Sequence, residues 1–359
     1  MAQGKSKDFA WELSKNLPTL NKPRTDFIAL FLLSILKVGT VNLVKVAIGM
    51  HSKAGAKSNY RRIQRFITQV RWCYEQLVPL ILKWSGIHGP LTLVIDRTNW
   101  KLGGTNINIL CISALGENFC VPIIWTLLSK KGISSQQERI KLMSSLVSIE
   151  GLPKIKLLIG DREFIGNTWF KYLKNNNIGI LIRIKETQTV KRNKKVYSVS
   201  SLIKGNTHNK RQCNGKQYWI EDMPVYIHGF QYQNHENKME KLIIASFEKP
   251  LQVSTEYSNR WYIECMFKNF KTNGFNLEQT HVTHPERLET LFGLLTLGYV
   301  CAVTAGKIIE KEKPELFKIS ANGRPKLSVF KAGFQELMCI LLNNMPSKWK
   351  TFFKFLSCA

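Results

Sequence analysis

The stretch from residue 91 to 185 restricts the fold more than any other part of the sequence. Three apolar segments with strand character follow one another there, separated by Gly-containing turns. A helix-like segment, a fourth strand, a second helix and a fifth strand come next. The predicted strands are LTLVID (91–96), INILCISALG (107–116), FCVPIIWTLL (119–128), KIKLLIGD (154–161) and GILIRIK (179–185), and the predicted helices are 136–151 and 167–177. This order predicts an α/β protein with one main sheet.

The same order of elements is that of the ribonuclease-H-like fold, in which the first and fourth strands are neighbours. Both of these strands are apolar, and both are predicted to end on an aspartate, Asp96 and Asp161. An ionised Asp against an apolar core is unfavourable unless it is paired or binds a metal ion. Either residue alone could stand at a strand end without a function. Two of them on neighbouring strands indicate a cation site at the sheet.

Residues 1–88 are predicted to be helical, because they show no strand-like alternation. Part of this region has the pattern of a helix–turn–helix motif. It consists of the apolar segment VNLVKVAIGM, a turn with Gly and Ser, and a basic helix that Ser58 could cap. The basic helix carries Arg61, Arg62 and Arg65, and residues 1–90 hold 14 Lys and Arg against four acidic residues. This composition favours a helical DNA-binding domain. A solvated basic helix face gives the same pattern and stays open as the alternative.

Residues 186–250 interrupt the α/β pattern with segments of β-hairpin character. Nine Lys and Arg and a single acid, Glu186, fall within 185–219, so this segment is predicted to be a basic β insertion. The remainder of the chain is helical again. The predicted organisation is a DNA-binding domain (1–88), a catalytic domain (89–285) with the β insertion (186–250), and a C-terminal helical region (286–359). The apolar content of the last region makes it the predicted dimer surface.

The net charge of +27, from 52 Lys and Arg against 25 Asp and Glu, favours a polyanionic partner. Nucleic acid is the first candidate, and an anionic membrane surface is the weaker one. The two most apolar stretches, 27–39 and 291–306, are shorter than the roughly 20 apolar residues that span a bilayer, so they are predicted to be core helices. The N-terminus has no apolar signal segment, and the eight Cys form no C-x-x-C pair. We therefore expect a cytoplasmic protein with reduced thiols.

Two aspartates need a third acidic ligand to hold two divalent cations. Mg²⁺ prefers oxygen ligands, and a pair of such ions can activate the attacking hydroxyl and stabilise the leaving 3′ oxygen in phosphodiester cleavage. The candidates are Glu138, Glu163, Glu256, Glu264 and Glu278. A helix predicted from Ser258 favours Glu264. Its face would carry the cations Arg260, Lys268 and Lys271. A surface ladder of ion pairs on this helix explains the same stripe.

Tyr257, Arg260, Glu264 and Lys271 stand at the spacing Y-x2-R-x3-E-x6-K. This spacing fits the signature of the DDE transposases of the insertion-sequence 4 family. The G-D-R-E-F around Asp161 is similar to the second aspartate motif of that family. The chain resembles the family from about residue 40 to residue 340, most strongly at 91–185 and 255–275.

The resemblance implies a ribonuclease-H-like catalytic core with an inserted β region. In such a core Asp96, Asp161 and Glu264 would bind two Mg²⁺ ions, for which Mn²⁺ would substitute. The residues that would contact DNA phosphates near the cleaved end are Tyr257, Arg260 and Lys271, with Lys268 on the same predicted face. Trp261 would hold a base flipped out of the duplex, and packing of the helix is its alternative role. The family often has an acidic or small residue after the first Asp, whereas this chain has Arg97, which leaves the roles of the residues around Asp96 open.

The predicted function is a cut-and-paste DNA transposase. It would bind the terminal inverted repeats of its insertion sequence, cleave DNA with Mg²⁺ and join the 3′-OH ends to target DNA, with a hairpin as one route to second-strand cleavage. Its partners would be double-stranded DNA and a second copy of the chain on that DNA, with no membrane, and it would lie in the bacterial cytoplasm at the nucleoid. The alternatives are an element-derived repressor that binds DNA without cutting it and a Mg²⁺-dependent nuclease of the same fold. The intact set of acids argues against the repressor, and the basic insertion argues against the nuclease.

Overall fold

The computed structural model describes residues 2–203, 215–233, 239–249, 252–318 and 326–358. The first helices are α1 (Ala2–Asn16), α2 (Lys22–Val38), α3 (Leu43–Gly49), α4 (Ala56–Gln69) and α5 (Tyr74–Ser85). The middle of the chain forms β1 (Leu91–Leu102), β2 (Thr105–Gly116), β3 (Phe119–Leu127), α6 (Gln136–Val147), β4 (Ile155–Gly160), α7 (Asn167–Asn175) and β5 (Gly179–Arg183). Next come β6 (Thr189–Arg192), β7 (Lys195–Ser198), β8 (Gln217–Ile220), β9 (Met223–Gln233) and β10 (Met239–Ser246). The last helices are α8 (Val253–Ser258), α9 (Trp261–Lys268), α10 (Pro285–Glu312), α11 (Val329–Leu342) and α12 (Pro346–Cys358).

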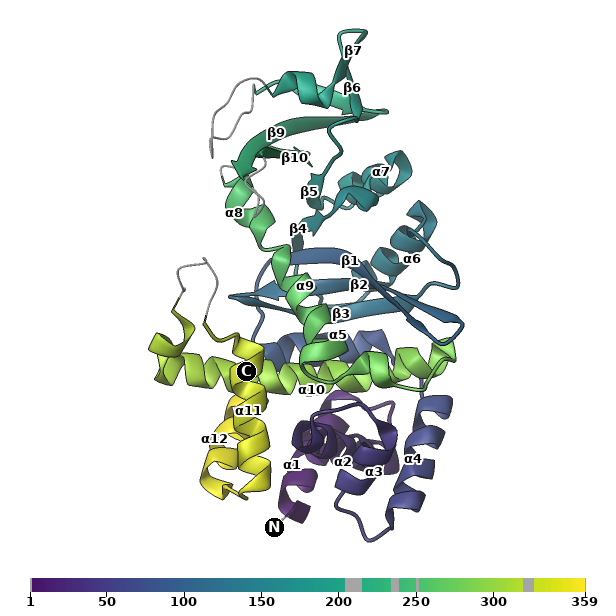
Figure 1. The fold of residues 1–359 in the computed structure, drawn as a ribbon, viewed down its shortest axis with the longest axis vertical. Helices are drawn as coiled ribbons and strands as arrows, with labels where there is room; N and C mark the ends of the chain where they lie inside the picture. The colour runs from purple at the N-terminus through teal and green to yellow at the C-terminus, as the bar shows by residue number, and fades with distance from the viewer. Residues whose placement is uncertain (1, 204–214, 234–238, 250–251, 319–325, 359) are drawn as a thin grey trace.

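The ten described strands form one sheet in the order β3-β2-β1-β4-β5-β10-β9-β8-β6-β7 (Figure 1). β1 is antiparallel to β2 and parallel to β4, and β4 is parallel to β5. The predicted neighbour relation of the first and fourth strands is confirmed. The inserted strands continue the same sheet, because β10 pairs with β5 through Ile244–Arg183 and Ala245–Ile182. Three cations of the predicted basic insertion, Lys204, Lys210 and Arg211, lie outside the described residues.

The first strand does not end at Asp96, as the sequence predicts, but continues to Leu102. β1 has two neighbours of different length. Its parallel pairing with β4 stops at Ile95–Gly160, whereas its antiparallel hairpin with β2 runs on to Leu102–Thr105. Asp96 therefore stands in the middle of β1, at the point where one edge of the strand loses its partner.

α10 is the central helix of the molecule and separates the sheet from the N-terminal helices (Figure 1). It packs against β3, α5, α2 and α4. By length and composition α10 could cross a membrane, but 83% of its apolar window is buried inside the protein, as expected of a core helix. The apolar content of the C-terminal region is thus largely buried within one chain. Apolar content that is buried within the chain does not by itself support a dimer contact, and the dimer surface in this region stays a prediction.

Two helix boundaries differ from the prediction. The helix predicted to begin at Ser258 is two helices, because α8 ends at Ser258 and α9 begins at Trp261, with Arg260 between them. The basic helix α4 begins at Ala56 after Gly55, so Ser58 lies inside its first turn and does not cap it.

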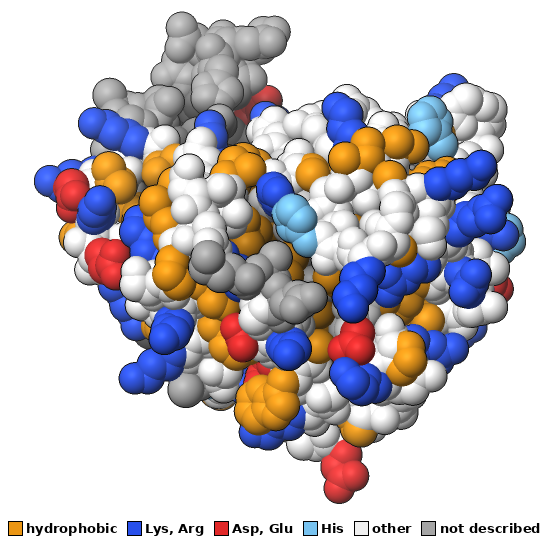
Figure 2. All heavy atoms as spheres, turned by 90° about the horizontal axis from the view of Figure 1, so that it is seen from below, with side chains coloured by type: hydrophobic (Ala, Val, Ile, Leu, Met, Phe, Trp, Pro, Cys, Tyr) orange, Lys and Arg blue, Asp and Glu red, His pale blue; other side chains and the backbone are white. Residues whose placement is uncertain are grey.

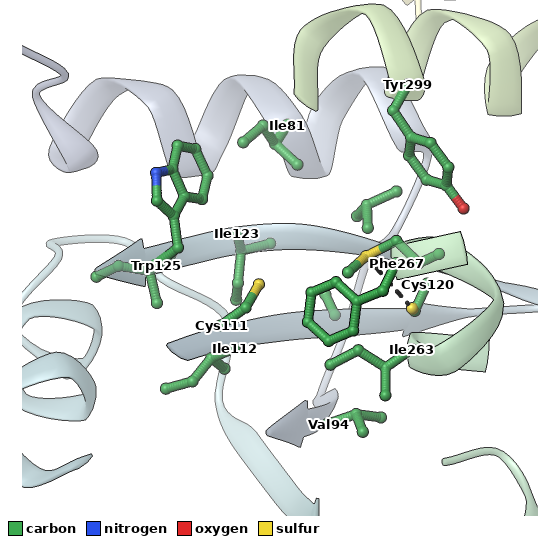
Figure 3. Close-up of a cluster of buried hydrophobic side chains, with 14 of the residues drawn as sticks. Ile81, Val94, Cys111, Ile112, Cys120, Ile123, Trp125, Ile263, Phe267 and Tyr299 are labelled. Atoms are coloured by element: carbon green, nitrogen blue, oxygen red, sulfur yellow. Dashed lines mark hydrogen bonds between the residues drawn. The ribbon is translucent and has the colours of Figure 1, made fainter. Parts of the chain in front are cut away.

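The buried face of α9 anchors this helix over β1 and β3. Ile263, Met266 and Phe267 are buried. Figure 3 shows Ile263 and Phe267 among apolar side chains from the strands, such as Val94 of β1 and Cys120 of β3. Because residues 263, 266 and 267 point inward, Glu264 lies on the outward side of a helix whose position is set by the core.

Candidate active site

Asp96 and Asp161 occupy matching positions on the two neighbouring strands. The last pair of the parallel β1–β4 ladder is Ile95 with Gly160, and each aspartate follows directly. The space around Gly160 is tight, because a Cβ there would lie 2.9 Å from Ile182 Cδ1 and 3.1 Å from Ile95 Cγ2, and these side chains would have to shift. The pairing of β1 with β4 therefore places the two aspartates next to each other at the end of one parallel ladder.

The surroundings of Asp96 disfavour its negative charge. Its side chain is 18% exposed, and burial raises the pKa of the carboxyl to about 6. The Arg97 backbone N–H, which donates to Oδ1 at 2.7 Å, and the Arg260 cation lower the pKa, whereas the charges of Glu163 and Asp161 raise it. A carboxylate with this balance gains from an additional cation nearby.

Arg260 joins Asp96 to Glu264. Its Nη1 donates to Asp96 Oδ2 at 3.3 Å, and its Nη2 pairs with Glu264 Oε1. Burial opposes the charge of the guanidinium, but Tyr257 and the carboxylates around it raise its pKa overall. Two other signature residues, Tyr257 and Glu264, thus interact with Arg260, and the Arg260–Glu264 step of the predicted ion-pair ladder is also present.

The oxygen atoms of the two aspartates suit a divalent cation. Asp161 Oδ1 is buried without a hydrogen-bond partner among the described residues, and an unpaired buried oxygen is unfavourable. Carboxylate oxygens are the ligands that Mg²⁺ and Mn²⁺ prefer. In the described part of the chain, no three His, Cys, Asp or Glu side chains lie close enough together to hold a metal ion. The carboxylate oxygens of Asp96 and Asp161 are of the right chemical type for such an ion, and Glu264 would have to leave Arg260 to join them.

Two of the other acidic candidates are engaged elsewhere. Glu163 forms a double hydrogen bond with Arg97, from Nε to Oε1 and from Nη2 to Oε2, each at 3.0 Å. Glu138 caps α6 and pairs with Lys130 at 2.8 Å. The Arg97–Glu163 pair is not among the contacts predicted from the sequence. The sequence does contain a sign of this ion pair. Arg97 directly follows Asp96, Glu163 lies two residues after Asp161, and the two aspartates are predicted to be neighbours.

A family model for the transposase DDE domain matches residues 88–301, more than half of the chain. The chain belongs to this family. No curated protein matches the chain. Membership of the DDE transposase family implies transposase activity and a DNA substrate in general terms, and domains of this family generally use divalent metal ions. The matched range contains the two aspartates, Arg260 and Glu264 together with the inserted strands.

Two residues of the DDE domain that are predicted to contact DNA, Tyr257 and Lys271, are buried or bound to other parts of the protein. Tyr257 is 6% exposed, and burial raises the pKa of its hydroxyl. Lys271 Nζ donates to the Asn99 carbonyl at 3.1 Å and pairs with Glu278 at 2.8 Å. The burial of Tyr257 does not fit a direct contact with DNA in this conformation, and Lys271 would have to leave Glu278 to reach a phosphate.

The outward strip of α9 consists of Trp261, Glu264 and Lys268, which are three and four residues apart and all exposed. Trp261 is 38% exposed. Its ring contacts Tyr262, with centroids 6.0 Å apart. Ile263 and its buried neighbours hold the helix on the sheet, and the partly exposed indole lies on the outward strip with Glu264. Base stacking and packing of the helix both stay predictions for Trp261.

The basic residues of α4 lie outside the DDE domain match. Arg61 and Arg65 are exposed, whereas Arg62 is half-buried with its guanidinium 5.9 Å from the Phe27 ring centroid. Figure 2 shows the molecule from below, the end at which Figure 1 places α1–α4 and α12, and Lys and Arg side chains prevail there over Asp and Glu. Such a face suits a polyanion.

Proposed function

We propose that this protein is the transposase of an insertion sequence of the insertion-sequence 4 family, with the YREK signature at Tyr257, Arg260, Glu264 and Lys271. It binds the terminal inverted repeats, cleaves the DNA strands with Mg²⁺ and transfers the 3′-OH ends to target DNA. One observation carries the proposal: Arg260, a signature residue, links Glu264 to Asp96 of β1, and Asp161 directly follows the neighbouring strand β4. This arrangement supports the proposal, because Glu264 needs only to leave Arg260 to reach the two aspartates.

The proposed chemistry assigns separate tasks to these side chains. Asp96, Asp161 and Glu264 provide the carboxylate oxygens of the metal site. When bound there, two divalent cations would activate the attacking hydroxyl and stabilise the leaving 3′ oxygen. Arg260 neutralises the scissile phosphate, since a guanidinium matches the geometry of two phosphate oxygens. As Arg260 turns to the phosphate it releases Glu264, so arrival of DNA completes the set of ligands.

The order β3-β2-β1-β4-β5 supports a ribonuclease-H-like core, with β6–β10 as its insertion. The domain limits at 88/89 and 285/286 are part of the proposal. Buried side chains from all three segments belong to one apolar cluster, so we expect the segments to melt together. The homodimer is proposed for the DNA complex, because two transposon ends must be brought together for transfer. Light scattering of the protein with and without end DNA measures it.

DNA binding by α4 can be tested through its salt dependence. Replacing Arg61, Arg62 and Arg65 by Ala should weaken binding to the inverted repeats. The slope of log affinity against log salt should flatten by about 0.9 for each phosphate that the variant no longer neutralises. The charge-matched control replaces Lys141, Lys156 and Lys174, which are exposed on α6, β4 and α7, away from the end of the molecule that carries α4 (Figure 1). Equal losses of affinity in both triple variants would mean that only net charge matters and that α4 is not the DNA-binding element.

The deciding experiment incubates the protein with Mg²⁺ and DNA that carries both ends of its own element. Release of a linear element with 3′-OH ends is the expected result. Specific binding of the ends without cleavage would instead make the protein a repressor. Cleavage that ignores the ends would make it a nuclease of the same fold. Either of the last two results overturns the proposal.

A further inference from the structure

The Arg97–Glu163 ion pair ties together the two segments that carry the aspartates. Arg97 follows Asp96 on β1, and Glu163 lies in the short 3-10 turn directly after Asp161. Both hydrogen bonds of the pair measure 3.0 Å, and the side chains are only 14% and 18% exposed. A bidentate arginine–carboxylate pair fixes orientation as well as distance. The two aspartate segments are therefore joined by side chains just where the β1–β4 backbone ladder stops.

Arg97 is itself held in place from a second strand. Its Nη1 donates to Asn108 Oδ1 of β2 at 2.9 Å. Asn108 is 2% exposed and donates through Nδ2 to the carbonyls of Lys130 and Gly132, at 2.9 and 3.1 Å. Such a chain of buried hydrogen bonds leaves Arg97 one orientation, in which its guanidinium faces Glu163.

A second arginine, Arg139, also contacts the turn that follows Asp161. Arg139 of α6, 2% exposed, donates through Nη1 to the Ile165 carbonyl at 3.1 Å, and its guanidinium lies 5.2 Å from the Phe164 ring centroid. Burial lowers the pKa of Arg139, and the charge of Glu163 is the first of those that counter it. Glu163 thus serves as the counter-charge of two arginines that enclose the Asp161 turn.

We propose that Arg97 and Glu163 are positioning residues that hold the Asp161 turn so that its carboxylate can share a divalent cation with Asp96. The inference rests on the proposed metal site and adds residues that do not touch the metal. It explains why Arg97 stands directly after Asp96. It also explains why Glu163, close to both aspartates, is not a ligand itself.

Mn²⁺ binding to the full chain, followed by the electron paramagnetic resonance of the free ion, tests the proposal without relying on DNA cleavage. Arg97→Met and Glu163→Gln change the local charge in opposite directions. If only charge mattered, removal of the arginine would tighten Mn²⁺ binding and removal of the glutamate would weaken it. A positioning role predicts that both variants bind Mn²⁺ about 10-fold more weakly or worse. Tighter or unchanged binding by Arg97→Met overturns the proposal.

Two control variants distinguish a loss of positioning from a general loss of stability and from a loss of the metal site itself. Glu12→Gln breaks the Lys83–Glu12 pair between α1 and α5, which is 2.7 Å long with Glu12 1% exposed. This variant should melt at a lower temperature yet bind Mn²⁺ as the wild type does. An equal loss of affinity in Glu12→Gln would show that destabilisation alone explains the result and would overturn the positioning role. Asp161→Asn must weaken Mn²⁺ binding, and if it does not, the proposed metal site fails rather than the positioning pair alone.

Discussion

The two halves of the candidate site are built in different ways. On the sheet side, Asp96 and Asp161 follow the last pair of a parallel ladder, and Arg97 and Glu163 join the segments again beyond it. On the helix side, Glu264 is 47% exposed and held by Arg260. The sheet side is thus set before any ligand arrives, whereas the helix side can change its partner. Under the proposed function, the set of metal ligands stays incomplete until Arg260 moves from Glu264 to a DNA phosphate.

Loss of any one acid should have the largest effect and tests whether the two halves form one site. Asp96→Asn, Asp161→Asn and Glu264→Gln should each slow strand cleavage by roughly 10³-fold or more, because charge stabilisation in the transition state is lost. Binding to the transposon ends should remain. Cleavage and gel-shift assays measure both, with Glu256→Gln of α8 as the matched control. If the Glu264→Gln variant cleaves DNA normally, Glu264 is not a metal ligand and the site consists of the sheet residues alone.

Replacement of Arg260 should affect metal binding and DNA cleavage in different ways, which separates the sheet side of the site from the helix side. Arg260→Met removes the cation that contacts Asp96 at 3.3 Å, so Coulomb's law predicts that Mn²⁺ binding to the free protein stays equal or tightens. Strand cleavage should fall by roughly 10²-fold, since the scissile phosphate loses its counter-charge. If Mn²⁺ affinity fell in parallel with cleavage, Arg260 would be organising the carboxylates and not competing with the metal.

The raised pKa of Asp96 predicts a pH dependence that belongs to the sheet side alone. Its folded pKa of about 6 lies above the ordinary value of 3.8, so the folded state holds this proton more tightly than the unfolded chain does. Between pH 4 and pH 6 the metal-free protein should therefore lose up to about 3 kcal/mol of stability as pH rises. Asp96→Asn should lack this part of the loss. Urea unfolding at several pH values measures it, and parallel pH profiles of the two proteins would refute the assignment.

Trp261 should have the smallest effect and one restricted to the helix side. The indole is 38% exposed, so Trp261→Ala removes only part of a buried side chain and should lower the free energy of unfolding by about 1–2 kcal/mol. Stacking of a flipped base is worth about 1–3 kcal/mol, so hairpin formation should slow far more than the first nick. An abasic site near the DNA end should partly restore the variant. A time course that resolves the two steps, run beside a melting curve, measures this, and equal slowing of both steps would argue against base stacking.

The positions of Asp96 and Asp161 can be predicted from the sequence, because they depend on short local patterns. Apolar runs ending at Asp96 and Asp161 show the strands, and their order indicates that the strands are neighbours. The continuation of β1 beyond Asp96 depends on the longer pairing with β2, which no local pattern shows. The break between α8 and α9 was missed for a similar reason, because Ser258 and Arg260 suit either one helix or two. The spacing of the signature identified Glu264, but its contact with Asp96 through Arg260 required the fold.

Metal-directed cleavage of the protein backbone tests most directly whether the acids share one metal site. Fe²⁺ in place of Mg²⁺, with ascorbate and peroxide, produces hydroxyl radicals that cut the chain near the bound ion. The free protein should be cut near Asp96 and Asp161. Addition of transposon-end DNA should add a cut near Glu264, and excess Mg²⁺ should suppress all three. Cuts at other positions, or a Glu264 segment that stays intact with DNA bound, would contradict a shared site.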